Sequence, residues 1–196
     1  MSGPRSCQGL TDLGREQATR LRERLCRSSQ ITLPVHIYAS VVPRAIETAH
    51  ILAEAFGEEQ REIREECGLC SWLVPAPCDG MPVTEFQQNL AAPGGGVFRP
   101  FESVSETWAE LSARTGRSLW SIAQRHCGET AVVVAHRETV VASLIAFGNL
   151  PLRPAFEVDV ANASLTEWHT EEDPSAWPPA CWTLARFNDN AHNEGL

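Results

Sequence analysis

The sequence lacks any apolar run near the roughly 18 residues that a membrane-spanning helix needs. It is also short of positive charge, with 16 Lys and Arg against 25 Asp and Glu and a formal net charge of −9. Nucleic acids and anionic membrane surfaces are bound through clustered basic residues, so neither is expected as a partner. No apolar secretory segment precedes Leu10, and the seven cysteines are scattered. These features predict a reducing, cytoplasmic compartment.

No internal repeat or long linker interrupts the chain, so residues 1–196 are predicted to form a single domain. Apolar residues at helical spacing, together with helix-capping residues, predict four helices. Short apolar or alternating segments predict strands between them. Helices alternating with strands favour an α/β fold with a mostly parallel sheet. The predicted helices are 11–27, 43–56, 105–125 and 138–147, and the predicted strands are 35–39, 131–135, 156–160 and a terminal hairpin of 165–168 with 182–187.

Residues 63–96 are less regular and contain several prolines and three consecutive glycines. We interpret this segment as a loop inserted over one end of the sheet. Loops in that position commonly select the substrate.

Two basic side chains follow predicted strands. Arg44 lies in the first turn of a helix, where backbone N–H groups favour an anion and a guanidinium can hold phosphate oxygens in bidentate fashion. His136 follows a buried strand, at the edge where open α/β sheets place their ligands. By position alone, a solvated helix-start arginine and a satisfied core histidine are the favoured interpretations.

Two carboxylates and two thiols follow in the irregular segment. Glu65 and Glu66 are candidates for a proton donor, although an acidic surface run is the alternative. Cys67 and Cys70 form a C-x-x-C pair, but no second pair completes a structural zinc site and no strand-to-helix context favours redox chemistry. We therefore expect neither a metal nor a cofactor.

Three segments occur in a specific order: LTDLGREQATRLRERL, HIYASVVPRAIETAHILAEAFG and AVVVAHRETV. They resemble the histidine phosphatase superfamily, also called the phosphoglycerate mutase-like family, over about residues 10–190. The resemblance implies a three-layer sandwich with a small phosphorylated ligand at one edge of the sheet. It also implies that Arg44 binds the phosphoryl group, that His136 is the second catalytic histidine and that Glu66, or else Glu65, is the acid.

Some positions depart from the family pattern. Val41 and Glu47 stand where proline and glutamine are usual, and Arg137 replaces a glycine beside the pocket. Arg137 could add phosphate affinity or block the site. The family's nucleophilic histidine sits in an Arg-His-Gly motif on a strand upstream of Leu10, but the nine residues before Leu10 contain no histidine.

We therefore expect the first strand to be missing, through truncation or a late start, and place it between the strands ending at Ser40 and His136. Open strand edges there would make the chain marginally stable, oligomeric or aggregation-prone. Three functions stay open: a phosphoric-monoester hydrolase whose nucleophile this chain lacks, a non-catalytic pseudo-phosphatase that binds a phosphorylated ligand or partner, and, ranked third, a phosphoglycerate mutase-type phosphotransferase. The resemblance is strongest to bacterial members, and the oligomeric state is left open.

Overall fold

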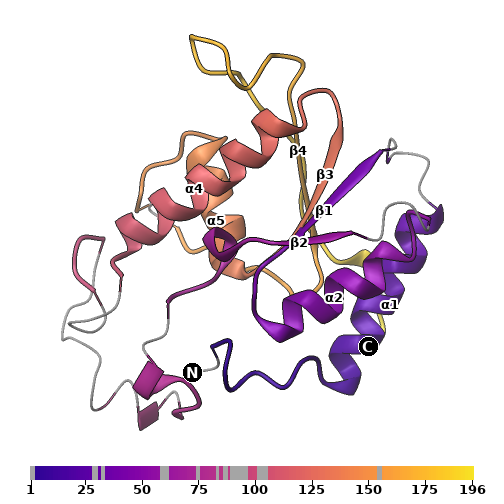
Figure 1. The fold of residues 1–196 in the computed structure, drawn as a ribbon, viewed down its shortest axis with the longest axis vertical. Helices are drawn as coiled ribbons and strands as arrows, with labels where there is room; N and C mark the ends of the chain where they lie inside the picture. Colours follow the sequence, from indigo (N-terminus) through magenta and orange to yellow (C-terminus); the bar gives the residue numbers. More distant parts are fainter. Residues whose placement is uncertain are drawn as a thin grey trace.

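The computed structural model describes residues 3–27, 31, 34–57, 62–73, 76–82, 84–85, 88, 97–100, 106–153 and 156–196. Helices and strands alternate along most of this chain, and they form an α/β fold with a parallel sheet flanked by helices (Figure 1). In chain order the elements are α1 (Asp12–Arg27), β1 (Val35–Ala39), α2 (Pro43–Ala53), β2 (Ile63–Glu65), α4 (Trp108–Arg125), β3 (Thr130–Val134), α5 (Arg137–Ala146), β4 (Leu165–His169) and β5 (Thr183–Asp189).

The parallel sheet has three strands in the order β2-β1-β3, with β1 in the middle. Ala39 of β1 lies opposite Glu65 on one side and Val134 on the other, so the carboxyl ends of the three strands meet at one edge. The segments that follow these strands therefore start close together. This edge is where ligands are bound in open α/β sheets.

Alternating side chains of β1 build the two cores. Val35, Ile37 and Ala39 face α1 and α2, while Tyr38 packs with Leu69 and with apolar residues of α4. Figure 1 shows α1 and α2 on one side of the sheet and α4 and α5 on the other. The period of two along the strand thus gives each helical layer its own apolar surface.

The two remaining strands, β4 and β5, form a separate antiparallel sheet. This second sheet is joined to the helices by aromatic rings. Phe147, the residue after α5, stacks on Trp182 at 4.2 Å between ring centroids, and it meets Trp168 of β4 edge-on at 5.8 Å. Aromatic contacts of this kind anchor the sheet to the α4 and α5 layer.

Several predicted boundaries differ from those observed. Residues 63–65, predicted as irregular loop, form β2, because three residues are enough to pair with β1 but too few to show an alternating pattern. The alternation at residues 156–160 forms no strand, and α2 ends at Ala53 rather than at Phe56. The start predicted for α4 at Ser105 lies outside the described residues, and the helix begins at Trp108 behind a Thr107 capping box.

The position expected for the missing strand was wrong. β1 and β3 are paired directly along their whole length, from Val35 opposite Thr130 to Ala39 opposite Val134, so nothing can lie between the strands that end at Ser40 and His136. The described strands form two separate sheets, β2-β1-β3 and β4-β5. Among the described residues no helix is both long and apolar enough to cross a membrane.

Candidate phosphate site

The site begins where β1 and β3 end side by side. Ser40 is fully buried and continues the ladder, since its backbone N–H donates to Val134 O at 2.9 Å. His136 caps the start of α5 two residues after β3, and its Nε2 lies 2.8 Å from Ser40 Oγ. The direct pairing of the two strands therefore brings the imidazole onto the hydroxyl.

The partners of His136 fix its tautomer. Arg44 Nη2 lies 3.3 Å from Nδ1, and a guanidinium can only donate, so Nδ1 must accept. Nε2 then carries the proton and donates to Ser40 Oγ, which in turn donates to Cys70 Sγ at 3.4 Å. Burial, followed by the charges of Arg44 and Arg114, lowers the pKa of His136 to about 4. The ring is therefore neutral near pH 7.

Arg44 lies in the first turn of α2 and spans the site. One end of its guanidinium reaches His136, and the other donates from Nη1 to Cys7 Sγ at 3.6 Å. Burial alone would raise the pKa of the Cys7 thiol, but hydrogen bonds with Gly9 and Arg44 bring it below the ordinary value. The positive guanidinium of Arg44, held between His136 and Cys7, makes this position suitable for binding an anion.

Helices α2 and α5 both begin at the edge of the sheet where β1 and β3 end. Pro43 begins α2 and Arg137 begins α5. Within the described chain, the cap residues Val42 and His136 offer the first helical N–H groups no side-chain acceptor. Helix starts that leave N–H groups without such acceptors bind phosphate-like anions well, because the dipole and the N–H groups act together.

Glu66 follows β2 at the same edge of the sheet, since its backbone N–H donates to Ala39 O at 2.8 Å. Its carboxylate is turned toward α4: Oε1 accepts from Gly68 N at 3.2 Å and from Ser118 Oγ at 3.3 Å. The neighbouring Glu65 is exposed. The structure thus brings Arg44 and His136 into contact, whereas the Glu66 carboxylate is bonded to a different element.

A residue that the sequence analysis missed holds this loop in place. Arg114 of α4 forms a bidentate ion pair with Glu106, at 2.6 and 3.0 Å, and both side chains are largely buried. The same guanidinium donates to the carbonyl oxygens of Gly68, Cys70 and Ser71 at 2.8 to 3.1 Å. No sequence signal marks Arg114, because the loop groups that it holds are backbone carbonyls about 45 residues away along the chain.

The first two residues of α5, Arg137 and Glu138, directly follow His136. Arg137 is exposed and donates from Nε and Nη2 to Val158 O at 3.1 and 2.6 Å. Glu138, which the sequence analysis also missed, accepts a hydrogen bond from Ser71 Oγ at 2.9 Å. Arg137 is therefore occupied with the segment before β4, and Glu138 joins α5 to the loop that follows Glu66.

Cys67, Cys70 and His192 have environments that are typical of structural residues. Cys67 and Cys70 are both free thiols, and burial raises the pKa of Cys67. His192, near the chain end, donates from Nε2 to Ala163 O at 2.9 Å, and its Nδ1 lies 3.3 Å from Arg24 Nη1. It fastens the chain end to α1.

Two curated relatives from Arabidopsis thaliana match part of this chain. Phosphoglycerate mutase-like protein 4 is 32% identical over 138 residues, which cover 65% of this chain and 55% of the relative. Metal-independent phosphoserine phosphatase is 30% identical over 139 residues, covering 65% and 53% respectively. The chain thus spans about half the length of the curated relatives it matches.

The fold is shared with a mycobacterial glucosyl-3-phosphoglycerate phosphatase solved with inorganic phosphate. The TM-score is 0.74 at 24% identity, covering 98% of this chain and 92% of the other. The family model of the histidine phosphatase superfamily (branch 1) matches residues 5–188, nearly the whole chain. The order of the three sequence segments, the parallel sheet and this match agree, and the chain belongs to the histidine phosphatase superfamily, branch 1.

Proposed function

We propose that this chain is the phosphate-binding body of a phosphoric-monoester hydrolase. The phosphoryl group of a small phosphorylated ligand would lie at the starts of α2 and α5. The contact between Arg44 and His136, at 3.3 Å and at the carboxyl edge of the sheet, carries this proposal.

The chemistry follows from these groups. Arg44 turns its guanidinium to two phosphoryl oxygens, and the imidazole of His136 faces a third. A dianion beside a buried neutral imidazole favours its protonation, so His136 takes up a proton when the ligand binds. Glu66 is the acid for the leaving oxygen, with Glu65 as the alternative. Glu66 must leave Ser118 to reach the ligand.

None of residues 1–35 is a histidine, and family resemblance places the attacking imidazole on a strand ahead of Leu10. A covalent mechanism loses several orders of magnitude in rate without its nucleophile. This observation favours a second candidate function for the chain as given, which is binding of a phosphorylated ligand or partner without turnover.

The experiment measures vanadate and phosphate binding by calorimetry, alongside hydrolysis of para-nitrophenyl phosphate. We expect binding of about millimolar strength, or about 4 kcal/mol, with negligible turnover and no burst. Arg44→Ala should abolish binding. Arg27→Ala, at the exposed end of α1, is the matched control and should leave it unchanged.

Two results would overturn the proposal. One is binding that Arg44→Ala does not affect. The other is robust hydrolysis by the chain as given that is lost in His136→Ala, because His136 would then be the nucleophile rather than an auxiliary group.

A further inference from the structure

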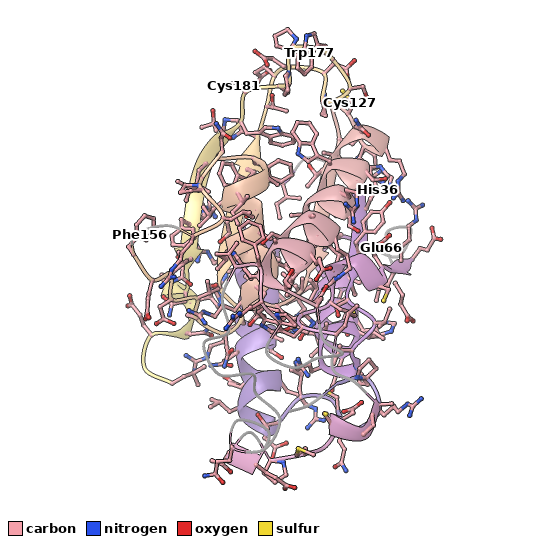
Figure 2. The ribbon with its side chains drawn as sticks, turned by 90° about the vertical axis from the view of Figure 1, so that its left-hand side faces the viewer. His36, Glu66, Cys127, Phe156, Trp177 and Cys181 are labelled. Atoms are coloured by element: carbon pink, nitrogen blue, oxygen red, sulfur yellow. The ribbon has the colours of Figure 1, made fainter. Side chains whose placement is uncertain are left out.

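A second cluster of polar side chains lies at the opposite end of the strands from Ser40. His36 is the second residue of β1, His126 caps the carboxyl end of α4 and Glu129 precedes β3. In Figure 2, His36 lies between the Cys127 end of the molecule and Glu66, on the side away from Phe156. The phosphate site is built from the other ends of the same strands, so the two sites are separate.

The three side chains converge on one point. Glu129 Oε2 lies 2.8 Å from His36 Nε2 and 3.1 Å from His126 Nδ1. The two rings stack with centroids 3.8 Å apart, and the three potential ligand atoms lie within 4.8 Å of one another. Ligand atoms around a tetrahedral ion with bonds of about 2.0–2.2 Å are separated by roughly 3.3–3.6 Å. The carboxylate oxygen would therefore move slightly outward, and the two stacked rings would turn until both lone pairs point to the ion.

Tyr38 orients the inner imidazole. Its hydroxyl lies 2.8 Å from His126 Nε2 and also accepts from Arg64 and Arg125, each at 3.3 Å. A hydroxyl that already accepts two hydrogen bonds has its proton free to give, so it donates to Nε2 and leaves Nδ1–H to donate to Glu129. For His126 Nδ1 to bind a cation, its proton must move to Nε2, and the Tyr38 hydroxyl must then accept from Nε2 in place of one of the two arginines. In His36 the proton must likewise move from Nε2 to Nδ1. Outer partners that set the ring orientation in this way are a regular feature of histidine metal sites.

We propose that His36 Nε2, His126 Nδ1 and a carboxylate oxygen of Glu129 bind a divalent transition-metal ion of the zinc class. Two imidazoles and one carboxylate are a donor set that such ions prefer to Mg²⁺ or Ca²⁺. The Glu129 side chain is 39% exposed, so the cluster opens to solvent and leaves room for a water ligand.

Charge limits the affinity. Arg64 and Arg125 lie beside Tyr38, on the inner side of the cluster, and their charges oppose a cation. Glu62 accepts from Arg64 at 3.2 Å and partly offsets it. We therefore expect binding in the micromolar range.

The ion would cross-link three segments of the fold and so stabilise it. It would tie the start of β1 to the end of α4 and the start of β3, whose side chains meet through two hydrogen bonds to a single carboxylate oxygen. An ion that binds only the folded chain stabilises it by RT ln(1 + L/Kd), where L is the free ion concentration, so the unfolding temperature rises with that concentration. Because the site is independent of the phosphate pocket, the proposal stands or falls without any measurement of hydrolysis.

The experiment follows thermal unfolding and calorimetric binding of ZnCl₂, with MgCl₂ as the comparison salt, and the visible spectrum after Co²⁺ addition. We expect zinc but not magnesium to raise the unfolding temperature of the parent. His36→Gln and Glu129→Gln should weaken zinc binding about tenfold or more. His50→Gln, an exposed histidine of α2, is the matched control and should bind as the parent does.

The seven free cysteines are the competing ligands, and cobalt distinguishes them. Bands of a nitrogen and oxygen environment that disappear in His36→Gln support the site. A sulfur-to-cobalt charge-transfer band, a zinc effect unchanged in both ligand variants or no zinc effect in the parent overturns it.

Discussion

At the scale of single residues, the site depends on a chain of hydrogen bonds that has one direction. Arg44 donates to His136, His136 donates to Ser40 and Ser40 donates to Cys70. Each group has the donor or acceptor that its neighbour needs, so the buried polar atoms are satisfied without a charge on the imidazole. Removing a member leaves its neighbour with an unmatched proton or lone pair.

The neutral state of His136 predicts a pH dependence of stability. Its folded pKa of about 4 lies below the ordinary 6.5, so the unfolded chain binds the proton more tightly. This contribution is fully present above about pH 6.5 and is lost as the pH falls toward 4, by up to about 3 kcal/mol. Urea unfolding of the parent and of His136→Gln across this window should show a shallower dependence in the variant. Equal slopes would contradict the burial argument, and His169→Gln on β4 provides the exposed control.

Ser40 gives a second prediction at this scale. In Ser40→Ala, His136 Nε2–H loses its acceptor inside the protein, and we expect a loss of about 1–3 kcal/mol in the free energy of unfolding. Ser71→Ala, which removes a partly exposed hydroxyl bonded to Glu138, should cost less. Chemical denaturation of the two variants measures the difference, and a Ser40→Ala protein as stable as the parent would show that the hydroxyl is dispensable.

At the scale of elements, the loop after β2 owes its shape to α4. Without the donations from Arg114, three carbonyl groups of the loop would need other partners. Residues 66–71 of this loop include one 3₁₀ turn, Cys67–Leu69, and little other regular structure. Its position beside the site is therefore set from outside.

Arg114→Ala should loosen this loop. We expect a loss of about 2 kcal/mol or more, because the largely buried carboxylate of Glu106 is left unpaired. Backbone amides of residues 67–71 should exchange faster with deuterium, while those in β1 keep their protection. Arg117→Ala, an exposed arginine on the same helix, is the control. Unchanged exchange at residues 67–71 would mean that other contacts hold the loop.

The elements also show how far the sequence could be interpreted. Helices α1, α4 and α5 and strand β1 were predicted within a few residues, because long apolar periodicities survive in most structural contexts. Arg44 and His136 were proposed because both follow predicted strands and lie in segments that resemble the family, and in the structure the two side chains are in contact. β2 was missed because its strand character comes from pairing with β1, and Arg114 and Glu138 were missed because their partners are distant in sequence.

At the scale of the whole molecule, the sheet is divided. β3 pairs only with β1 and β4 only with β5 within the described chain, so each has a second edge without a strand partner there. Residues 130–133 of β3 are only partly buried, whereas four of the five residues of β1 are buried. Open edges of this kind accept another extended strand.

An added strand tests both the fold and the function. A segment ending in Arg-His-Gly, fused ahead of Met1, should raise the unfolding temperature and should restore para-nitrophenyl phosphate hydrolysis by several orders of magnitude. The same segment with its histidine changed to alanine is the control, and it should give the stability without the activity. A fusion that changes neither quantity would show that the strand does not dock.

The pairing of β1 with β3 also shapes how the chain reaches this structure. Val35 must find Thr130 across a long stretch of chain, whereas the β4–β5 hairpin and the α4–α5 pair close over short distances in sequence. Closing a long loop costs entropy before any contact repays it, so parallel pairing of distant strands is slow. The helical pair and the hairpin are then expected to form early, and the edge that holds Ser40 beside His136 would be assembled in the final, rate-limiting step.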